Sequence, residues 1–194
     1  MKGCQDGAAH IASSRVLCHI SPVNAMEPPD SHHLSAAEGW LGLGNWREAR
    51  AELNLISPEL RGHPDVLVVA RELYFQAQKW DSAAEVAAMV ARLRSDEVDS
   101  WITWAYATRR MDGGGLTAAK QILVEARERF QNSAIVAYNL ACYECQLGQP
   151  AAARQWLKTA FRIGNLKQIR GMALADRDLE PLWDEIREMT GAAR

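Results

Sequence analysis

The residues best suited to chemistry in this 194-residue sequence are Cys142 and Cys145, which form a C-x-x-C pair. In a redox enzyme such a pair begins a helix, where the helix dipole lowers the thiol pKa and favours the reactive thiolate. The surrounding residues instead predict that this pair lies within a helix that follows no strand. A zinc site would need a second pair at a useful spacing, and Cys4 and Cys18 lie far away in the sequence. We interpret Cys142 and Cys145 as small apolar residues, with a redox-sensitive or metal-binding pair as the alternative.

The remaining candidates for chemistry are weaker. None of the histidines lies beside a carboxylate at a catalytic or ligand spacing within a helix. The adjacent pair His32-His33 would suit weak metal binding, but we expect it to serve in a helix cap or a loop. The glycines of 113–115 lack the Lys-Ser/Thr that follows in a phosphate-binding loop, and we expect a turn there. The histidines are His10, His19, His32, His33 and His63. The sequence predicts no catalytic residue, no metal and no cofactor.

Composition limits the classes of partner. A hydrophobic content of 48% argues against disorder of the whole chain. The net charge of −2 gives no electrostatic reason to expect binding to nucleic acid or to an anionic membrane. No apolar run approaches the roughly 20 residues of a membrane-spanning helix. We expect a cytoplasmic protein without either partner.

Residues 1–30 differ from the rest of the chain. They lack a helical period and end in Pro28-Pro29, so we expect a disordered tail. A second interpretation is that translation begins at Met26, and a third is a targeting or partner-binding arm. Three polar residues interrupt the apolar run that a secretory signal needs: Asp6, His10 and Arg15.

A repeated pattern organises the remaining chain. Its clearest copy is 133–164, which predicts a helix, a tight turn at 147–150 and a second helix. A small residue in the second helix recurs at steps of 34, 36 and 34 residues, and a second residue recurs three places before it. The small residues are Ala49, Ala83, Ala119 and Ala153. The residues three places earlier are Trp46, Trp80, Leu116 and Pro150. We expect each pair of helices to cross closely at these alanines.

This pattern resembles the tetratricopeptide repeat over about 31–164. The resemblance implies an all-α, right-handed α-solenoid of about four helix-turn-helix units, with 165–194 as capping helices and tail. The stretch LADRDLEPLWDEI, at 174–186, is similar to a closing segment of bacterial tetratricopeptide proteins of no assigned activity. Three positions depart from the repeat: Arg71 replaces a small residue, and Thr108 and Glu144 replace aromatic residues.

Several residues predict where helices begin and end. Asn45, with a glutamate three places later, has the spacing of an N-cap and its reciprocal acceptor. We expect Thr117 and Asp178 to cap later helices, Pro150 to occupy a first helical position and Gly164 to follow a helix end.

The resemblance also implies a binding surface. In this family the first helix of each pair lines a concave groove that binds extended peptides or helices. We expect a mainly apolar and aromatic groove here, with a few polar anchors. Its predicted positions are Leu34, Glu38, Val68, Glu72, Phe75, Ile102, Tyr106, Arg109, Tyr138, Asn139 and Cys142. The positions of the family's carboxylate clamp hold Leu34, Glu38, Val69, Asp99 and Thr103. A C-terminal carboxylate is therefore not the expected ligand.

These features predict a non-catalytic protein-interaction scaffold that binds a protein or peptide partner in the groove. One alternative is a small chaperone resembling those of bacterial secretion systems, and another is a redox protein using Cys142 and Cys145. A further alternative is that the groove binds no separate partner. The tail helix or a second copy of the chain would then cover its apolar surface.

Overall fold

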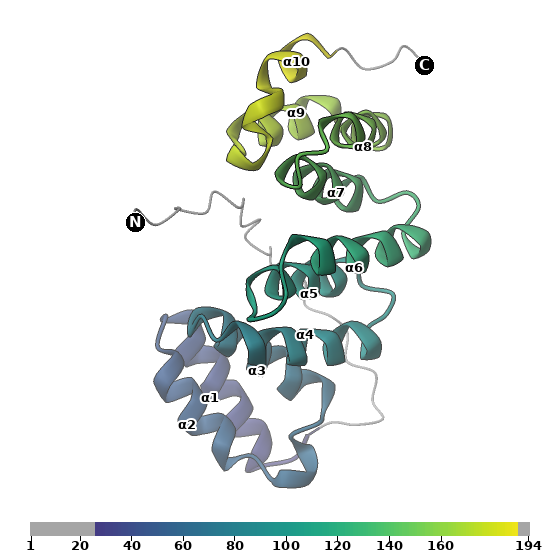
Figure 1. Ribbon diagram of the computed structural model, residues 1–194. Coiled ribbons are helices and arrows are strands. Elements are labelled where there is room, and N and C mark those ends of the chain that lie inside the picture. The colour runs from purple at the N-terminus through teal and green to yellow at the C-terminus, as the bar shows by residue number, and fades with distance from the viewer. Residues whose placement is uncertain (1–25, 190–194) are drawn as a thin grey trace. The chain divides into compact units, whose positions relative to one another are not determined.

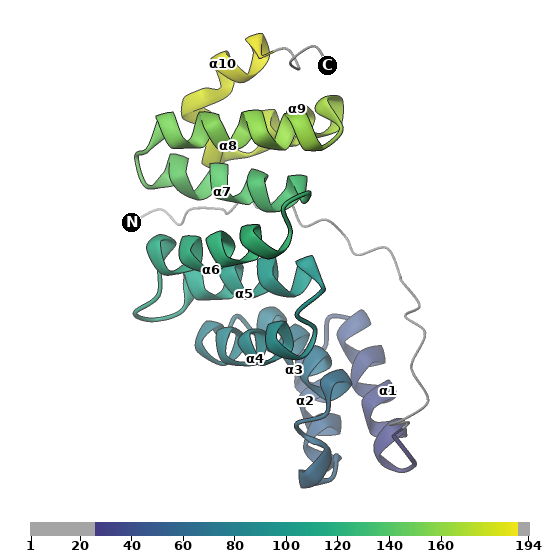
Figure 2. The same ribbon diagram turned by 90° about the vertical axis from the view of Figure 1, so that its right-hand side faces the viewer.

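The computed structural model describes residues 26–189, all of whose regular elements are helical, as expected (Figures 1 and 2). These residues divide into two compact units, 26–115 and 116–189, which we call the N-terminal unit and the C-terminal unit. In the described part of the chain, no helix combines the length and apolarity needed to cross a membrane. The predictions made for residues 1–25 concern a segment outside the described residues.

The N-terminal unit is built from consecutive helices that pack on one another. Helices α1 and α2 pack together, α3 packs on both of them, and α4 packs on α3 and α5. Figure 1 shows α1 and α2 lying side by side. The elements are α1 (Asp30–Gly42), α2 (Trp46–Leu55), η1 (Pro58–Leu60), α3 (Pro64–Gln76), α4 (Trp80–Leu93) and α5 (Val98–Arg110).

The C-terminal unit is centred on α7, which packs on α6, on α8 and on the short 3₁₀ helix η2. Figure 2 shows α7 and α8 side by side. Helices α9 and α10, which belong to the expected capping segment, lie in this same unit. The elements are α6 (Leu116–Arg129), α7 (Ala134–Gln146), α8 (Pro150–Ile163), α9 (Leu166–Ala175), η2 (Arg177–Leu182) and α10 (Trp183–Glu188).

The boundary between the two compact units lies within the predicted repeat array. We expected a single array over 31–164 followed by a separate cap. The division instead falls between Gly115 and Leu116, inside that array, and assigns α5 and α6 to different units. These two helices were expected to form the third pair.

The repeated positions have the environments expected of them. The four alanines at the predicted crossings, Ala49, Ala83, Ala119 and Ala153, are completely buried. Each residue three places earlier is the first residue of α2, α4, α6 or α8. The predicted burial of these alanines and the predicted starts of these four helices are therefore confirmed.

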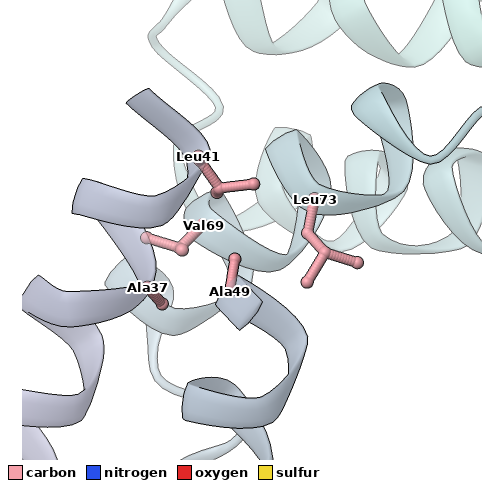
Figure 3. Close-up of a cluster of buried hydrophobic side chains, with 5 residues drawn as sticks. All are labelled: Ala37, Leu41, Ala49, Val69 and Leu73. Carbon is pink, nitrogen blue, oxygen red and sulfur yellow. The ribbon is translucent and has the colours of Figure 1, made fainter. Parts of the chain in front are cut away.

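Figure 3 shows how one of these alanines takes part in a core. Ala49 of α2 lies among Ala37 and Leu41 of α1 and Val69 and Leu73 of α3, and all five side chains are buried. The small side chains allow the helix backbones to approach, and the larger ones fill the remaining space. The cluster joins one predicted pair to the first helix of the next.

The predicted helix ends are mostly confirmed. Asn45 caps α2, because its Oδ1 accepts a hydrogen bond from the Glu48 amide at 3.4 Å. Pro150 is the first residue of α8, and Gly164 follows its last residue. The prediction for Thr117 is wrong, because α6 begins one residue earlier, at Leu116.

Glu144, one of the departures from the repeat, has a charged partner. Its Oε1 lies 3.3 Å from Nζ of Lys120, so the two side chains link α7 to α6. The glutamate is only 12% exposed, and a buried carboxylate is tolerated where a cation accompanies it. The pair explains how a charged residue replaces the expected aromatic one.

The turns between paired helices place Gln78 under backbone strain. Gly44 and Gly148 adopt left-handed φ angles of 73° and 71°, and Gln78, 34 residues after Gly44, has a φ of 53°. A left-handed backbone costs a residue with a side chain about 1–2 kcal/mol. Glycine avoids this cost but loses about 0.5–1 kcal/mol through its greater freedom in the unfolded chain.

We expect Gln78→Gly to raise the free energy of unfolding by about 0.5–1 kcal/mol, the difference between these two effects. Urea titration followed by circular dichroism measures it. Gly44→Gln should shift the midpoint in the opposite direction. A lower midpoint for Gln78→Gly would show that the glutamine side chain contributes more than the backbone strain costs.

Candidate protein-binding surface

The eleven predicted positions fall on two units. Eight of them lie on α1, α3 and α5 of the N-terminal unit, and three lie on α7 of the C-terminal unit. We call the first group the A-helix surface. It consists of Leu34, Glu38, Val68, Glu72, Phe75, Ile102, Tyr106 and Arg109.

An aromatic cluster joins three helices at the A-helix surface. The rings of Phe75 (α3) and Tyr106 (α5) are stacked, with centroids 5.7 Å apart and planes at 20°. Trp80, the first residue of α4, meets both edgewise, at 5.6 Å from Phe75 and 6.0 Å from Tyr106. All three residues are half-buried, so the rings are held in place while part of each stays accessible.

Arg110 completes this cluster. Its guanidinium carbon lies 3.6 Å from the Tyr106 ring centroid and 5.4 Å from that of Trp80. A cation over an aromatic face is attracted by the ring quadrupole. The sequence prediction named Arg109 and missed both Arg110 and Trp80. The spacing of four residues between Tyr106 and Arg110 was a signal that could have identified Arg110.

The charged residues of the A-helix surface are mostly acidic. Glu38 and Glu72 are both exposed. Partial burial raises the pKa of the Glu38 carboxyl, and the nearby charge of Asp65 raises it further. Glu72 accepts a hydrogen bond from Nε2 of Gln76 at 3.0 Å, and the same amide nitrogen lies 3.0 Å from the Leu41 carbonyl oxygen. These bonds tie the surface of α3 to the end of α1.

Arg71 lies next to this surface at the position where the repeat predicts a small residue. Burial lowers the pKa of its guanidinium, while the charge of neighbouring Glu72 raises it. The charge of Arg94 lowers that pKa, whereas Glu97 and Asp99 raise it, and the net effect is a pKa below the ordinary value. Arg71, which replaces the expected small residue, therefore lies near acidic side chains. We do not interpret it as a binding site for an anion.

Two of the three positions predicted on α7 are buried. Tyr138 and Cys142 are only 4% and 3% exposed, because the segment around Asp176 covers them. Asn139 is half-buried, and its Nδ2 donates to the Ile135 carbonyl at 2.9 Å. The expectation of an accessible surface at Tyr138 and Cys142 is therefore corrected: the C-terminal segment of the chain buries them.

Asp176 is the centre of this covered region, and it is itself 7% exposed. Its Oδ2 accepts a hydrogen bond from the Tyr138 hydroxyl at 2.8 Å and lies 3.5 Å from Sγ of Cys142. Its Oδ1 accepts from the Asp178 amide at 3.0 Å, which makes Asp176 the N-cap of η2. The sequence prediction that Asp178 is the cap is wrong by two residues.

The environment of the C-x-x-C pair opposes redox chemistry. Both thiols are free and buried, in the half of α7 away from its N-terminus. Burial raises the pKa of Cys142, and the charge of Asp176 raises it further. Burial also raises the pKa of Cys145. Since the thiolate is the reactive form, these surroundings favour the interpretation of both residues as packing residues.

The buried groups on α7 predict a loss of stability at alkaline pH. Burial raises the pKa of the Tyr138 phenol, as it does that of the Cys142 thiol, so both are neutral in the folded chain. In the unfolded chain they titrate near about 8.5 for cysteine and about 10 for tyrosine. The contribution of these neutral groups to the free energy of unfolding is fully present below the lower of the two unfolded pKa values. It declines as the pH rises above that value, because the unfolded chain loses these protons at a lower pH than the folded chain does.

We expect each group to contribute a slope of about 1.4 kcal/mol per pH unit above its unfolded pKa. The free energy of unfolding should be measured between pH 8 and pH 10.5 for the parent chain and for Cys142→Ala. The variant should show a shallower decline between about pH 8.5 and pH 10, where only cysteine titrates. Parallel curves would show that Cys142 ionises as freely in the folded chain as in the unfolded one.

Of the described histidines, His32 and His33 lie inside α1 rather than in a cap or a loop, and His33 and His63 make structural contacts. Nδ1 of His33 lies 2.9 Å from Oε2 of Glu52, linking α1 to α2. Nδ1 of His63 accepts the Asp65 amide at 3.3 Å and caps α3. Within 26–189, no group of three or more His, Cys, Asp or Glu residues could hold a metal ion.

Comparison with known proteins adds no assignment. No protein-family model matches the chain, and no curated protein matches it significantly.

Proposed function

We propose that the protein is a non-catalytic interaction module of tetratricopeptide-like helix pairs, arranged as a right-handed α-solenoid. It binds a peptide or helix of a protein partner through the A-helix surface of the N-terminal unit. Support for the repeat comes from the steps of 34 and 36 residues, which place a buried alanine in four helices.

The observation that carries the binding proposal is the half-exposed cluster of Phe75, Trp80, Tyr106 and Arg110. Tyrosine, tryptophan and arginine are the residues most enriched where binding energy concentrates in protein interfaces. Rings already fixed by their neighbours lose little rotamer freedom on binding, so more of the contact energy remains as affinity. Three helices supply these rings, which suits a partner segment that lies across α3 and α5.

The surface charges indicate where a partner makes its polar contacts. Glu72 is exposed on α3, three residues before Phe75 and therefore about one helical turn away from it. A charge at the rim of an interface steers association and opposes wrong partners more than it adds affinity. Reversing that charge therefore tests the surface without removing any of the packed rings.

We expect Glu72→Arg and Tyr106→Glu each to reduce recovery of the partner at least tenfold in affinity capture followed by mass spectrometry. Glu85→Arg is the matched control, because Glu85 is exposed on α4 outside the A-helix surface and undergoes the same change of charge. Circular dichroism should establish that all three variants are folded. Equal recovery by Glu72→Arg, Tyr106→Glu and the parent chain would reject this surface as the binding site.

A further inference from the structure

The negative charge of the chain is concentrated in the N-terminal unit. With histidine neutral, residues 26–115 hold nine lysines and arginines against fourteen aspartates and glutamates, a formal net charge of −5. Residues 116–189 hold ten of the first kind and nine of the second, a net charge of +1. A field of one sign attracts partners of the opposite sign and raises their rate of association. The N-terminal unit therefore favours a basic partner.

The first two helices of the A-helix surface carry this acidity to the predicted binding face. Helix α1 contains no lysine or arginine, and α3 contains only Arg71, which is half-buried. The carboxylates that these two helices expose are those of Glu38 and Glu72. A partner that lies across α1 and α3 therefore meets exposed carboxylates and no exposed lysine or arginine of either helix.

Glu38 has no positively charged partner among the described residues. Its carboxylate forms no hydrogen bond or ion pair with any of them. Partial burial and the negative charge of Asp65 both raise the pKa of Glu38, so its surroundings oppose its charge. Asp65 already has a cation, since its Oδ1 lies 2.8 Å from Nη2 of Arg94. A cation supplied by a partner would offset the repulsion that Glu38 now experiences.

The two exposed glutamates form one row with the aromatic cluster. Glu38, Glu72 and Tyr106 lie at steps of 34 residues, which places them at equivalent positions of α1, α3 and α5. Neighbouring helices pack about 8–10 Å apart, a distance that an extended chain spans in about three residues. One short segment could therefore place a basic side chain over α1 and α3 and an apolar side chain on the rings of Phe75 and Tyr106.

We propose that the partner segment is basic, with a lysine or arginine that pairs with Glu38 and Glu72 and a large apolar side chain that packs on Phe75 and Tyr106. This partner class rests on the proposed function of the A-helix surface and adds its chemistry. Like charges across an interface oppose association, so the same carboxylates disfavour an acidic peptide. They also disfavour a second copy of this surface, which would present the same two glutamates, and a nucleic acid, which would present phosphates.

Selection from a displayed library of random twelve-residue peptides against the full chain tests the proposal. The selected peptides should be enriched at least fivefold in lysine and arginine over aspartate and glutamate. They should bind Tyr106→Glu and the double variant Glu38→Lys/Glu72→Lys at least tenfold more weakly than the parent chain. Glu85→Lys/Glu125→Lys is the matched control, because both residues are exposed outside the A-helix surface and the total charge changes equally. This control should bind within twofold of the parent, and circular dichroism should establish that every variant is folded.

An exchange of charges separates direct pairing from damage to the fold. A selected peptide whose basic residues are replaced by glutamate should bind Glu38→Lys/Glu72→Lys at least fivefold more tightly than it binds the parent chain. Absence of this rescue, or an equal loss of binding in the Glu85→Lys/Glu125→Lys control, would overturn the pairing with Glu38 and Glu72.

The outcomes for Tyr106→Glu distinguish the partner class from the proposed function. Selected peptides that are acidic or uncharged, and that lose binding to Tyr106→Glu, would reject a basic partner while the proposed function stands. Selection of no peptide, or only of peptides that bind Tyr106→Glu as well as they bind the parent chain, would reject both.

Discussion

Replacing Asp176 by alanine is expected to lower the free energy of unfolding of the C-terminal unit by about 2–4 kcal/mol, the sum of a lost helix cap and lost hydrogen bonds to a charged group. One carboxylate oxygen caps η2 through the Asp178 amide, and the other accepts the Tyr138 hydroxyl. Alanine would leave that hydroxyl buried without its acceptor, and a buried donor without a partner costs more than the bond itself contributed. Thermal and urea unfolding of the full chain measure the loss.

The size of this effect should depend on the contacts of Asp176 rather than on the removal of a negative charge. Asp184→Ala is the matched control, because the Asp184 side chain is 97% exposed and its substitution should change stability by less than about 0.5 kcal/mol. Asp176→Asn keeps an oxygen that can cap η2, so we expect an intermediate loss. An Asp176→Ala chain as stable as Asp184→Ala would show that the covered region of α7 does not depend on this residue.

The helices themselves could be predicted because their signals are local and repeated. The alanines at steps of 34 and 36 residues, together with Asn45, Pro150 and Gly164, determine most element positions without reference to distant parts of the chain. Reliance on such local signals also explains why the sequence analysis chose Asp178 rather than Asp176 as the N-cap of η2. Asp176 and Asp178 are equally good caps by type, and only the contact with Tyr138 on α7 distinguishes them.

The binding surface was harder to predict because exposure depends on which segments pack together. Helical register places Tyr138 and Cys142 on the same type of face as Ile102 and Tyr106. Only the return of the chain at Asp176 buries the first two. Conversely, Trp80 was identified only as a recurring residue three places before Ala83, yet it shares the aromatic cluster of the A-helix surface with Phe75. Periodicity identifies the face of a helix but not the segment that covers it.

The buried contacts of the C-terminal segment bear on which unit could bind a partner reversibly. Leu179 and Leu182 of η2 and Ile186 of α10 are essentially completely buried, and each such side chain contributes about 1.5–3 kcal/mol on burial. A partner could reach Tyr138 only by displacing the segment around Asp176, which leads into η2 on α7. The C-terminal segment is therefore a permanent part of its unit, and the A-helix surface of the N-terminal unit is the better candidate for reversible binding.

The register of the repeat predicts a large effect at Ala153. This residue is completely buried on α8, which packs on α7. Ala153→Trp would force an indole into a helix crossing that has space for a methyl group, and overpacking of this kind costs about 1–3 kcal/mol or more. Differential scanning calorimetry of the full chain should show a clearly lower melting temperature for the transition of the C-terminal unit.

A matched substitution lies two residues away on the same helix. Ala151 is exposed, so Ala151→Trp adds the same side chain with the same helix propensity but should change stability by less than about 0.5 kcal/mol. The difference between the two variants therefore isolates the cost of packing at the crossing. Equal melting temperatures would mean that Ala153 does not lie at a close helix contact, and the alignment of the other three alanines on it would then lose its physical basis.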